Sequence, residues 1–162
     1  MKCFSDGTPV SGQQFDYAFD TIGNRTQTET GGDAGGQNLR AANYSANNLN
    51  QITSRDVPPY VNVIGESYAT NGVTVNGQSP YRHGEYFRAE LPVNNDAAPL
   101  WTNMTVSASV GGSVSGDVYV PQEPEHFGYD ADGNLTNDGR WSYVWDGENR
   151  LIQMSVNTNV GP

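Results

Sequence analysis

Short runs of alternating apolar and polar residues, separated by turn-forming Gly and Asn, dominate the chain. Side chains that alternate with a period of two lie on opposite faces of a β-strand. The best helical candidate, residues 36–50, is interrupted by Asn and Gly. In the middle of the chain the pattern predicts short strands at residues 60–65, 73–76, 85–93, 102–109 and 113–120. Strands of this length and spacing are typical of a β-sandwich, so we expect an all-β fold.

Outside this central region a short phrase occurs four times, at residues 17–26, 44–52, 127–136 and 143–152. Each copy has an aromatic strand end, an acidic or amide residue, a tight turn and a restarting strand. The acidic or amide side chain bonds to the turn backbone, and Gly or Asn supplies the positive φ angle that a tight hairpin requires. One hairpin is marginally stable alone, so we expect the copies to form an antiparallel sheet.

The best copies read YAFDTIGNRT at 17–26, FGYDADGNLT at 127–136 and YVWDGENRLI at 143–152. They resemble the YD repeats of the Rhs family, found in bacterial polymorphic toxins, insecticidal toxin complexes and teneurins. The resemblance covers residues 15–52 and 127–154, and it implies a hollow β-shell that encloses a toxin or other cargo. A shell takes many repeats, and the self-cleaving aspartate motif and C-terminal toxin of the family do not occur in this sequence. The resemblance therefore implies a piece of shell.

The central region resembles bacterial Ig-like domains of the glucodextranase B type, which implies a spacer or a weak surface-binding module. Proline-containing linkers at residues 55–59 and 121–124 bound it, and residues 81–84 are expected to form a turn. Its predicted core consists of Val61, Val63, Val73, Val75, Phe87, Leu91, Val106, Ala108, Val118 and Val120.

These patterns predict a domain organisation in which one module is inserted into another. Residues 15–57 and 122–157 are expected to form the YD-repeat hairpin sheet, with an Ig-like β-sandwich inserted at residues 58–121. We further expect the two repeat blocks to pair around the insertion. Residues 1–14 are expected to be poorly ordered.

Composition restricts the partners. The net charge of −10 argues against nucleic acid, because phosphate binding needs clustered Lys and Arg. The single cysteine, Cys3, allows no intrachain disulfide, and no apolar run reaches the length of a membrane span. We expect a fragment of a longer exported chain, extracellular or at the cell surface.

The strongest candidate for a metal site is the acidic turn that follows Tyr129. Oxygen-bearing side chains alternate there as in the first part of a calcium loop, although the positions of Gly and Glu depart from an EF-hand. The candidate ligands are Asp130, Asp132, Asn134 and Asp138. The alternative is a hairpin turn whose side chains only cap its own backbone.

Aromatic residues are the candidates for ligand binding. Trp141, Tyr143 and Trp145 alternate along one expected strand and therefore share a face. If exposed, they would stack on sugar rings, and if buried, they would be the packing surface of the sheet. Trp101, in a loop after Pro99, is a separate candidate for a sugar or partner contact.

The function that these features favour is structural: a YD-repeat shell fragment of a large secreted or toxin-delivery protein, without catalysis. Its partners would be further YD repeats of a parent chain or further copies of itself. One alternative is a calcium-dependent hydrolase of a small ester, lactone or glycoside. A second alternative is a carbohydrate-binding module.

Overall fold

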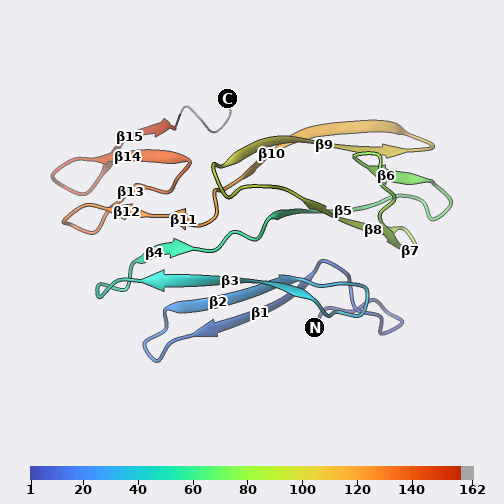
Figure 1. Ribbon diagram of the computed structural model, residues 1–162, viewed down its shortest axis with the longest axis horizontal. Helices are drawn as coiled ribbons and strands as arrows, with labels where there is room; N and C mark the ends of the chain where they lie inside the picture. The colour runs from blue at the N-terminus through green and yellow to red at the C-terminus, as the bar shows by residue number, and fades with distance from the viewer. Residues whose placement is uncertain (158–162) are drawn as a thin grey trace.

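The fold is all-β. The computed structural model describes residues 1–157 of the 162-residue chain, and over that range its regular elements are fifteen β-strands. Consistent with the strand-rich sequence pattern, helices are absent from residues 1–157. The strands belong to a repeat sheet and to a module inserted between its two blocks (Figure 1).

The repeat sheet starts with a five-stranded antiparallel set in the order β1-β2-β3-β4-β11. It continues into a four-stranded set in the order β12-β13-β14-β15. The first set contains β1 (Gln14–Phe19), β2 (Arg25–Gly31), β3 (Leu39–Ala46), β4 (Ile52–Arg55) and β11 (Glu125–His126). The second contains β12 (Gly128–Tyr129), β13 (Leu135–Asn137), β14 (Trp141–Trp145) and β15 (Leu151–Val156).

The two sets of strands meet at β4 and β11. Ser54 pairs with His126, and the ion pair between Arg55 and Glu125 lies in the next register position. Only Phe127 separates β11 from β12, and its N–H donates to the carbonyl of Thr53 at 2.9 Å. The two sets of strands therefore form one antiparallel surface.

The inserted module consists of two three-stranded sheets. One has the order β5-β8-β7, formed by β5 (Tyr60–Glu66), β8 (Tyr86–Pro92) and β7 (Tyr81–His83). The other has the order β10-β9-β6, formed by β10 (Gly112–Val120), β9 (Leu100–Ala108) and β6 (Val73–Val75). All five predicted strands are present. The turn predicted at residues 81–84 is wrong, because residues 81–83 pair with β8 as a strand.

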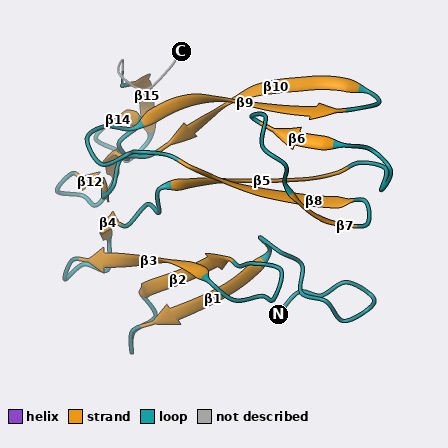
Figure 2. Ribbon diagram, turned by 45° about the vertical axis from the view of Figure 1, so that its right-hand side comes forward, coloured by secondary structure: helices purple, strands orange, loops and turns teal. Residues whose placement is uncertain are grey.

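Side chains from both sheets of the insertion form its core. One cluster joins Val73 and Val75 of β6 to Phe87 and Ala89 of β8. A second joins Val61, Met104 and Val120. Five of the predicted core residues are buried, namely Val61, Val73, Val75, Phe87 and Val120, whereas Ala89 and Met104 were not predicted. This core places the two sheets face to face, with β5-β8-β7 between β10-β9-β6 and strands β1–β3 (Figure 2).

The two linkers of the insertion are tied together by Asn95, which is fully buried. Its side-chain amide donates to the carbonyls of Val57 at 3.1 Å and Pro121 at 2.9 Å. The carboxylate of Glu123 also accepts a hydrogen bond from the N–H of Val57. The insertion therefore leaves and rejoins the repeat sheet at one neck.

The N-terminal segment, predicted to be poorly ordered, packs against the rest of the protein. Val10 and Ser11 are buried, and Tyr86 donates from its hydroxyl to the carbonyl of Ser11 at 2.5 Å. The ring of Phe4 stacks on His83 with centroids 4.2 Å apart. This loop holds the insertion against the start of β1, a role that the polar local sequence does not indicate.

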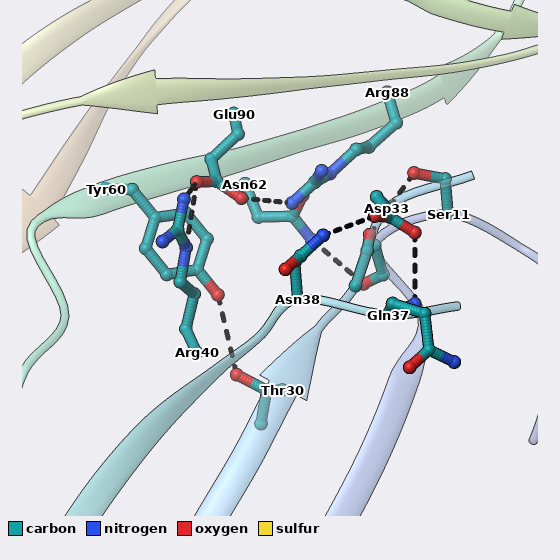
Figure 3. A network of polar contacts seen from close by, with 12 residues as sticks. Ser11, Thr30, Asp33, Gln37, Asn38, Arg40, Tyr60, Asn62, Arg88 and Glu90 are labelled. Carbon is teal, nitrogen blue, oxygen red and sulfur yellow. Dashed lines mark hydrogen bonds and ion pairs between the residues drawn. The ribbon is translucent and has the colours of Figure 1, made fainter. Parts of the chain in front are cut away.

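A polar network fixes the insertion to the repeat sheet (Figure 3). Buried Arg88 of β8 donates to Asn62 at 2.8 Å and to Glu90 at 2.6 Å, and Arg40 of β3 donates to the other oxygen of Glu90. Burial alone would raise the pKa of Glu90, but the bonds from Arg40 and Arg88 outweigh it and lower that pKa. Charged groups from both regions therefore compensate one another.

Candidate functional site: a row of hairpin turns

One turn shows the geometry of the repeat. The backbone N–H groups of Asp132 and Asn134 donate to one carboxylate oxygen of Asp130, at 3.0 and 2.8 Å. The side-chain amide of Asn134 donates to the other oxygen at 3.1 Å. Gly133 has a φ of 91°, and its N–H donates to the carbonyl of Asp130 at 3.2 Å. This is a tight turn followed by a left-handed residue, which fits the twist of a hairpin.

Five turns share this geometry, and each spans five residues. The first residue accepts hydrogen bonds from the backbone N–H groups of the third and fifth, and the fourth has a positive φ angle. The first residues are Asp20, Asp33, Asn47, Asp130 and Asp146. The fourth residues are Gly23, Gly36, Asn50, Gly133 and Asn149.

The turn at Asp33 was missed in the sequence. It joins β2 to β3 at the opposite end of the sheet from the other four (Figure 1). The residues before it are Gly31 and Gly32, so the aromatic strand end that marks the other copies is absent. The Asp-x-Gly-Gly-Gln pattern of residues 33–37 is the sequence signal that marks this turn.

The other four turns lie side by side at one end of the repeat sheet (Figure 1), and we call them the turn row. Neighbours in the row are joined by side-chain hydrogen bonds that all run in one direction. The fifth residue of each turn donates to the fourth residue of the next. The three bonds are Asn24 to the side chain of Asn50 at 3.1 Å, Gln51 to the carbonyl of Gly133 at 3.4 Å, and Asn134 to the side chain of Asn149 at 2.8 Å.

The strands beneath the turn row repeat one register. At each junction between neighbouring hairpins, the third residue after one turn pairs with the fourth residue before the next. The pairs are Gln27 with Asn43, Ser54 with His126, and Asn137 with Ser142. All six residues are polar. The same register therefore joins neighbouring hairpins at all three junctions. We call this repeated junction the lateral step.

The turn hydrogen bonds also set the acidity of the turn residues. The side-chain amide of Asn134 is the main cause that lowers the pKa of Asp130. The backbone N–H of Arg150 is the main cause that lowers the pKa of Asp146. Donors that bond to a carboxylate favour its charged form. These aspartates therefore remain ionised as acceptors for their own turns.

The four candidate calcium ligands are divided between two turns. Asp130 and Asn134 bond to each other within one turn. Asp138 lies in the following turn, where it accepts from the N–H of Trp141 at 2.7 Å and from the hydroxyl of Tyr143 at 2.7 Å. Across residues 1–157, no group of three His, Cys, Asp or Glu side chains is placed to hold a metal ion. The hydrogen bonds correspond to the alternative in which the turn caps its own backbone.

The aromatic candidates of β14 take part in internal contacts. The indole N–H of Trp145 donates to the carbonyl of Leu135 at 2.7 Å. Burial, and then the hydrogen bond to Asp138, raise the pKa of the Tyr143 hydroxyl to about 12. These two side chains therefore hold strands and turns of the repeat sheet together.

Trp101 and Trp141 both lie close to one cation, although they come from different modules. The guanidinium carbon of Arg140 lies 5.3 Å from the ring of Trp101, 5.4 Å from that of Trp141 and 4.9 Å from that of Tyr119. Cation–π contacts at these distances are attractive. The cluster joins the ends of β9 and β10 to the repeat sheet.

A groove of about 390 Å³ lies between strands β1–β4 and the insertion. Phe15, Tyr17 and Tyr44 line it from the repeat sheet, and Tyr60 lines it from β5. The guanidinium carbon of Arg25 lies 5.4 Å from the ring of Tyr17 and 5.6 Å from that of Tyr44. Two exposed aromatic side chains of the repeat sheet, Phe15 and Tyr17, therefore line this groove, which no local sequence pattern indicates.

Comparison with known proteins gave no match to a family model, to a curated protein or to a solved structure. Among residues 1–157 there is no helix long and apolar enough to cross a membrane.

Proposed function

We propose that this chain is a structural protein: a section of wall built from YD-type hairpins, with an Ig-like module as a spacer on one face. The observation that carries the proposal is the lateral step, repeated three times with one register and one direction of side-chain bonding. A repeated step of this kind adds hairpins to a sheet while keeping the same strand register and the same side-chain bonds. Repeat proteins gain their stability from such contacts between neighbours.

The use of the polar and aromatic side chains supports the same role. The turn aspartates bond to their own backbones, and Tyr143 and Trp145 bond within the repeat sheet. These acidic and aromatic groups are therefore already engaged in holding hairpins. In this proposal the wall belongs to a larger secreted or toxin-delivery assembly.

Hydrogen–deuterium exchange on the intact chain tests whether the two blocks behave as one wall. Peptides from β3 and β4 should exchange at the same rate as peptides from β11 to β14, because one sheet opens as a unit. Independent exchange of the two blocks would contradict the proposal. Gln51→Ala, which removes the side chain that donates to the carbonyl of Gly133 in the other block, should make the blocks exchange at different rates, and Asn48→Ala serves as the control.

A ligand screen on the same protein tests the alternatives. Addition of calcium, a glycan panel or small esters should leave the exchange pattern and the tryptophan fluorescence unchanged. Saturable quenching by a glycan that Trp101→Ala abolishes would overturn the structural role in favour of carbohydrate binding. Ester hydrolysis lost in Asp132→Ala and on chelation would favour the hydrolase.

A further inference from the structure

The repeat sheet ends in two open edges, β1 and β15. Strand β1 pairs only with β2, and β15 pairs only with β14 within residues 1–157. The two edges lie at opposite ends of the sheet (Figure 1). An open edge presents unpaired backbone groups to any strand of suitable register.

At the turn row, one of these edges offers hydrogen-bond donors and the other offers an acceptor. In each lateral step the fifth residue of one turn donates to the fourth residue of the next. At the β15 end the fifth residue of the last turn is Arg150, whose side chain is 70% exposed and carries several donors. At the β1 end the fourth residue of the first turn is Gly23, whose carbonyl is an acceptor of the kind that Gly133 supplies inside the row.

The register rule predicts how the two edges would meet. The third residue after the last turn is Gln153, and the fourth residue before the first turn is Asp16. Pairing them continues the series of polar pairs seen at the three internal junctions. The strand directions also fit, because β15 leaves the turn row and β1 approaches it, as in each antiparallel junction within the chain.

This register brings exposed apolar side chains together. With Gln153 opposite Asp16, Met154 lies opposite Phe15 and Ile152 lies opposite Tyr17. The four side chains are large and exposed in the single chain, at 48% for Met154, 58% for Phe15, 63% for Ile152 and 49% for Tyr17. Cross-strand pairs of aromatic and aliphatic residues stabilise a sheet. At this joint the four apolar side chains therefore share one face, and Gln153 and Asp16 lie on the other.

From these observations we propose that β15 of one copy of the chain pairs with β1 of a second copy, so that the repeat sheet continues from copy to copy. This inference rests on the proposed structural role and names its partner as a second copy. Because the two surfaces differ, the contact is head-to-tail, and it produces chains or closed rings rather than a symmetric dimer.

Sedimentation velocity of the intact protein over a range of concentrations tests the proposal. The wild type should form species larger than dimers as concentration rises. Phe15→Lys and Met154→Glu should each weaken association about tenfold or more, because each places a charge in the apolar joint. Val114→Lys, at a position 75% exposed on β10, is the matched control and should associate as the wild type does.

A combined variant tests the register. In the double variant Phe15→Lys with Met154→Glu, each joint places a lysine opposite a glutamate, so association should recover. In the double variant Phe15→Lys with Met154→Lys, two like charges meet and association should stay weak. A one-to-one mixture of the Phe15→Lys and Met154→Lys single variants should stop at a dimer, because one free β15 edge and one free β1 edge remain to pair. Circular dichroism shows whether each variant is folded.

A wild type that remains monomeric at all concentrations would overturn the inference, and so would variants with unchanged association. A single variant that forms dimers as well as the mixture does would indicate a symmetric contact and would also overturn it. None of these results changes the exchange behaviour of the two blocks within one chain. Failure of this inference is therefore distinguishable from failure of the proposed wall.

Discussion

The inserted module and the repeat sheet are both antiparallel β-structure, but different forces hold them together. The insertion buries Val75 completely and Phe87 to 4% exposure between two sheets. In the repeat sheet, by contrast, Phe15 and Ile152 remain 58% and 63% exposed. Its strands are joined instead by hairpin turns and by the hydrogen bonds of the turn row.

This difference shows how one chain supports two kinds of stability. A closed core gains no further stability from added strands, because it leaves no exposed apolar surface for them to cover. A sheet stabilised by lateral contacts gains with each neighbour and keeps apolar side chains available at its ends. The insertion therefore has a buried core of its own, whereas the repeat sheet keeps large apolar side chains exposed on its edge strands β1 and β15.

Truncating a phenylalanine should reveal the largest difference in stability between the two regions. Phe87→Ala opens a cavity in the core of the insertion and should lower the free energy of unfolding by about 4 kcal/mol. Phe15→Ala, on the exposed face of β1, should change it by less than about 1 kcal/mol in the monomer. Chemical denaturation of both variants at low concentration measures the difference. Equal losses would mean that both regions rely on a buried core.

Removal of Glu90 tests the joint between the two regions. Glu90→Ala leaves buried Arg88 without its carboxylate and should cost about 3 kcal/mol. Glu66→Ala, on the exposed part of β5, provides the control. Thermal unfolding that remains a single transition at a lower midpoint is expected. An unchanged midpoint would show that the polar network contributes nothing to docking.

Loss of the hydrogen bonds of one turn should lower the free energy of unfolding by less than the loss of Phe87 or Glu90. Asn47→Ala removes the acceptor for the N–H groups of Leu49 and Gln51 and should cost about 1 kcal/mol. Its neighbour Asn48 is also exposed and serves as the control in Asn48→Ala. Denaturant unfolding measures both. Equal values for the two variants would contradict the role given to the first residue of the turn.

Acid should loosen the repeat sheet. The pKa values of Asp20, Asp33, Asp130 and Asp146 are lowered in the folded chain from an ordinary 3.8. A lowered pKa contributes stability that is present above the unfolded value and is lost as the pH falls through the folded value. Unfolding measured below pH 3.8 should therefore show declining stability, with a smaller decline when Asp146 is replaced by Asn. A flat profile would contradict the turn hydrogen bonds.

The sequence predicted the elements whose signals are local. Alternation located the strands of the insertion, and the phrase of an aromatic strand end followed by an acidic or amide residue located four of the five turns. The Asp33 turn escaped because Gly31 and Gly32 replace the aromatic flank. Strand β7 escaped because its three residues do not alternate in polarity.

The features that were missed depend on residues far apart in the chain. Arg40, Glu90 and Arg88 meet only after the insertion folds back on β3, and no local pattern marks them. The acidic turn looked like a cation loop because turn capping and calcium binding use the same oxygen-bearing residues. In the structure, two backbone N–H groups donate to the carboxylate of Asp130, which is the pattern expected of turn capping.

A double-mutant cycle across Asn134 and Asn149 tests the turn row most directly. The two side chains are 2.8 Å apart, and Asn149→Gly retains a residue suited to its φ of 59°. Unfolding free energies of Asn134→Ala, Asn149→Gly and the double variant give the coupling between neighbouring turns. We predict a favourable coupling of about 0.5 kcal/mol or more. A coupling of zero would contradict the claim that the hairpins hold one another in a continuous wall.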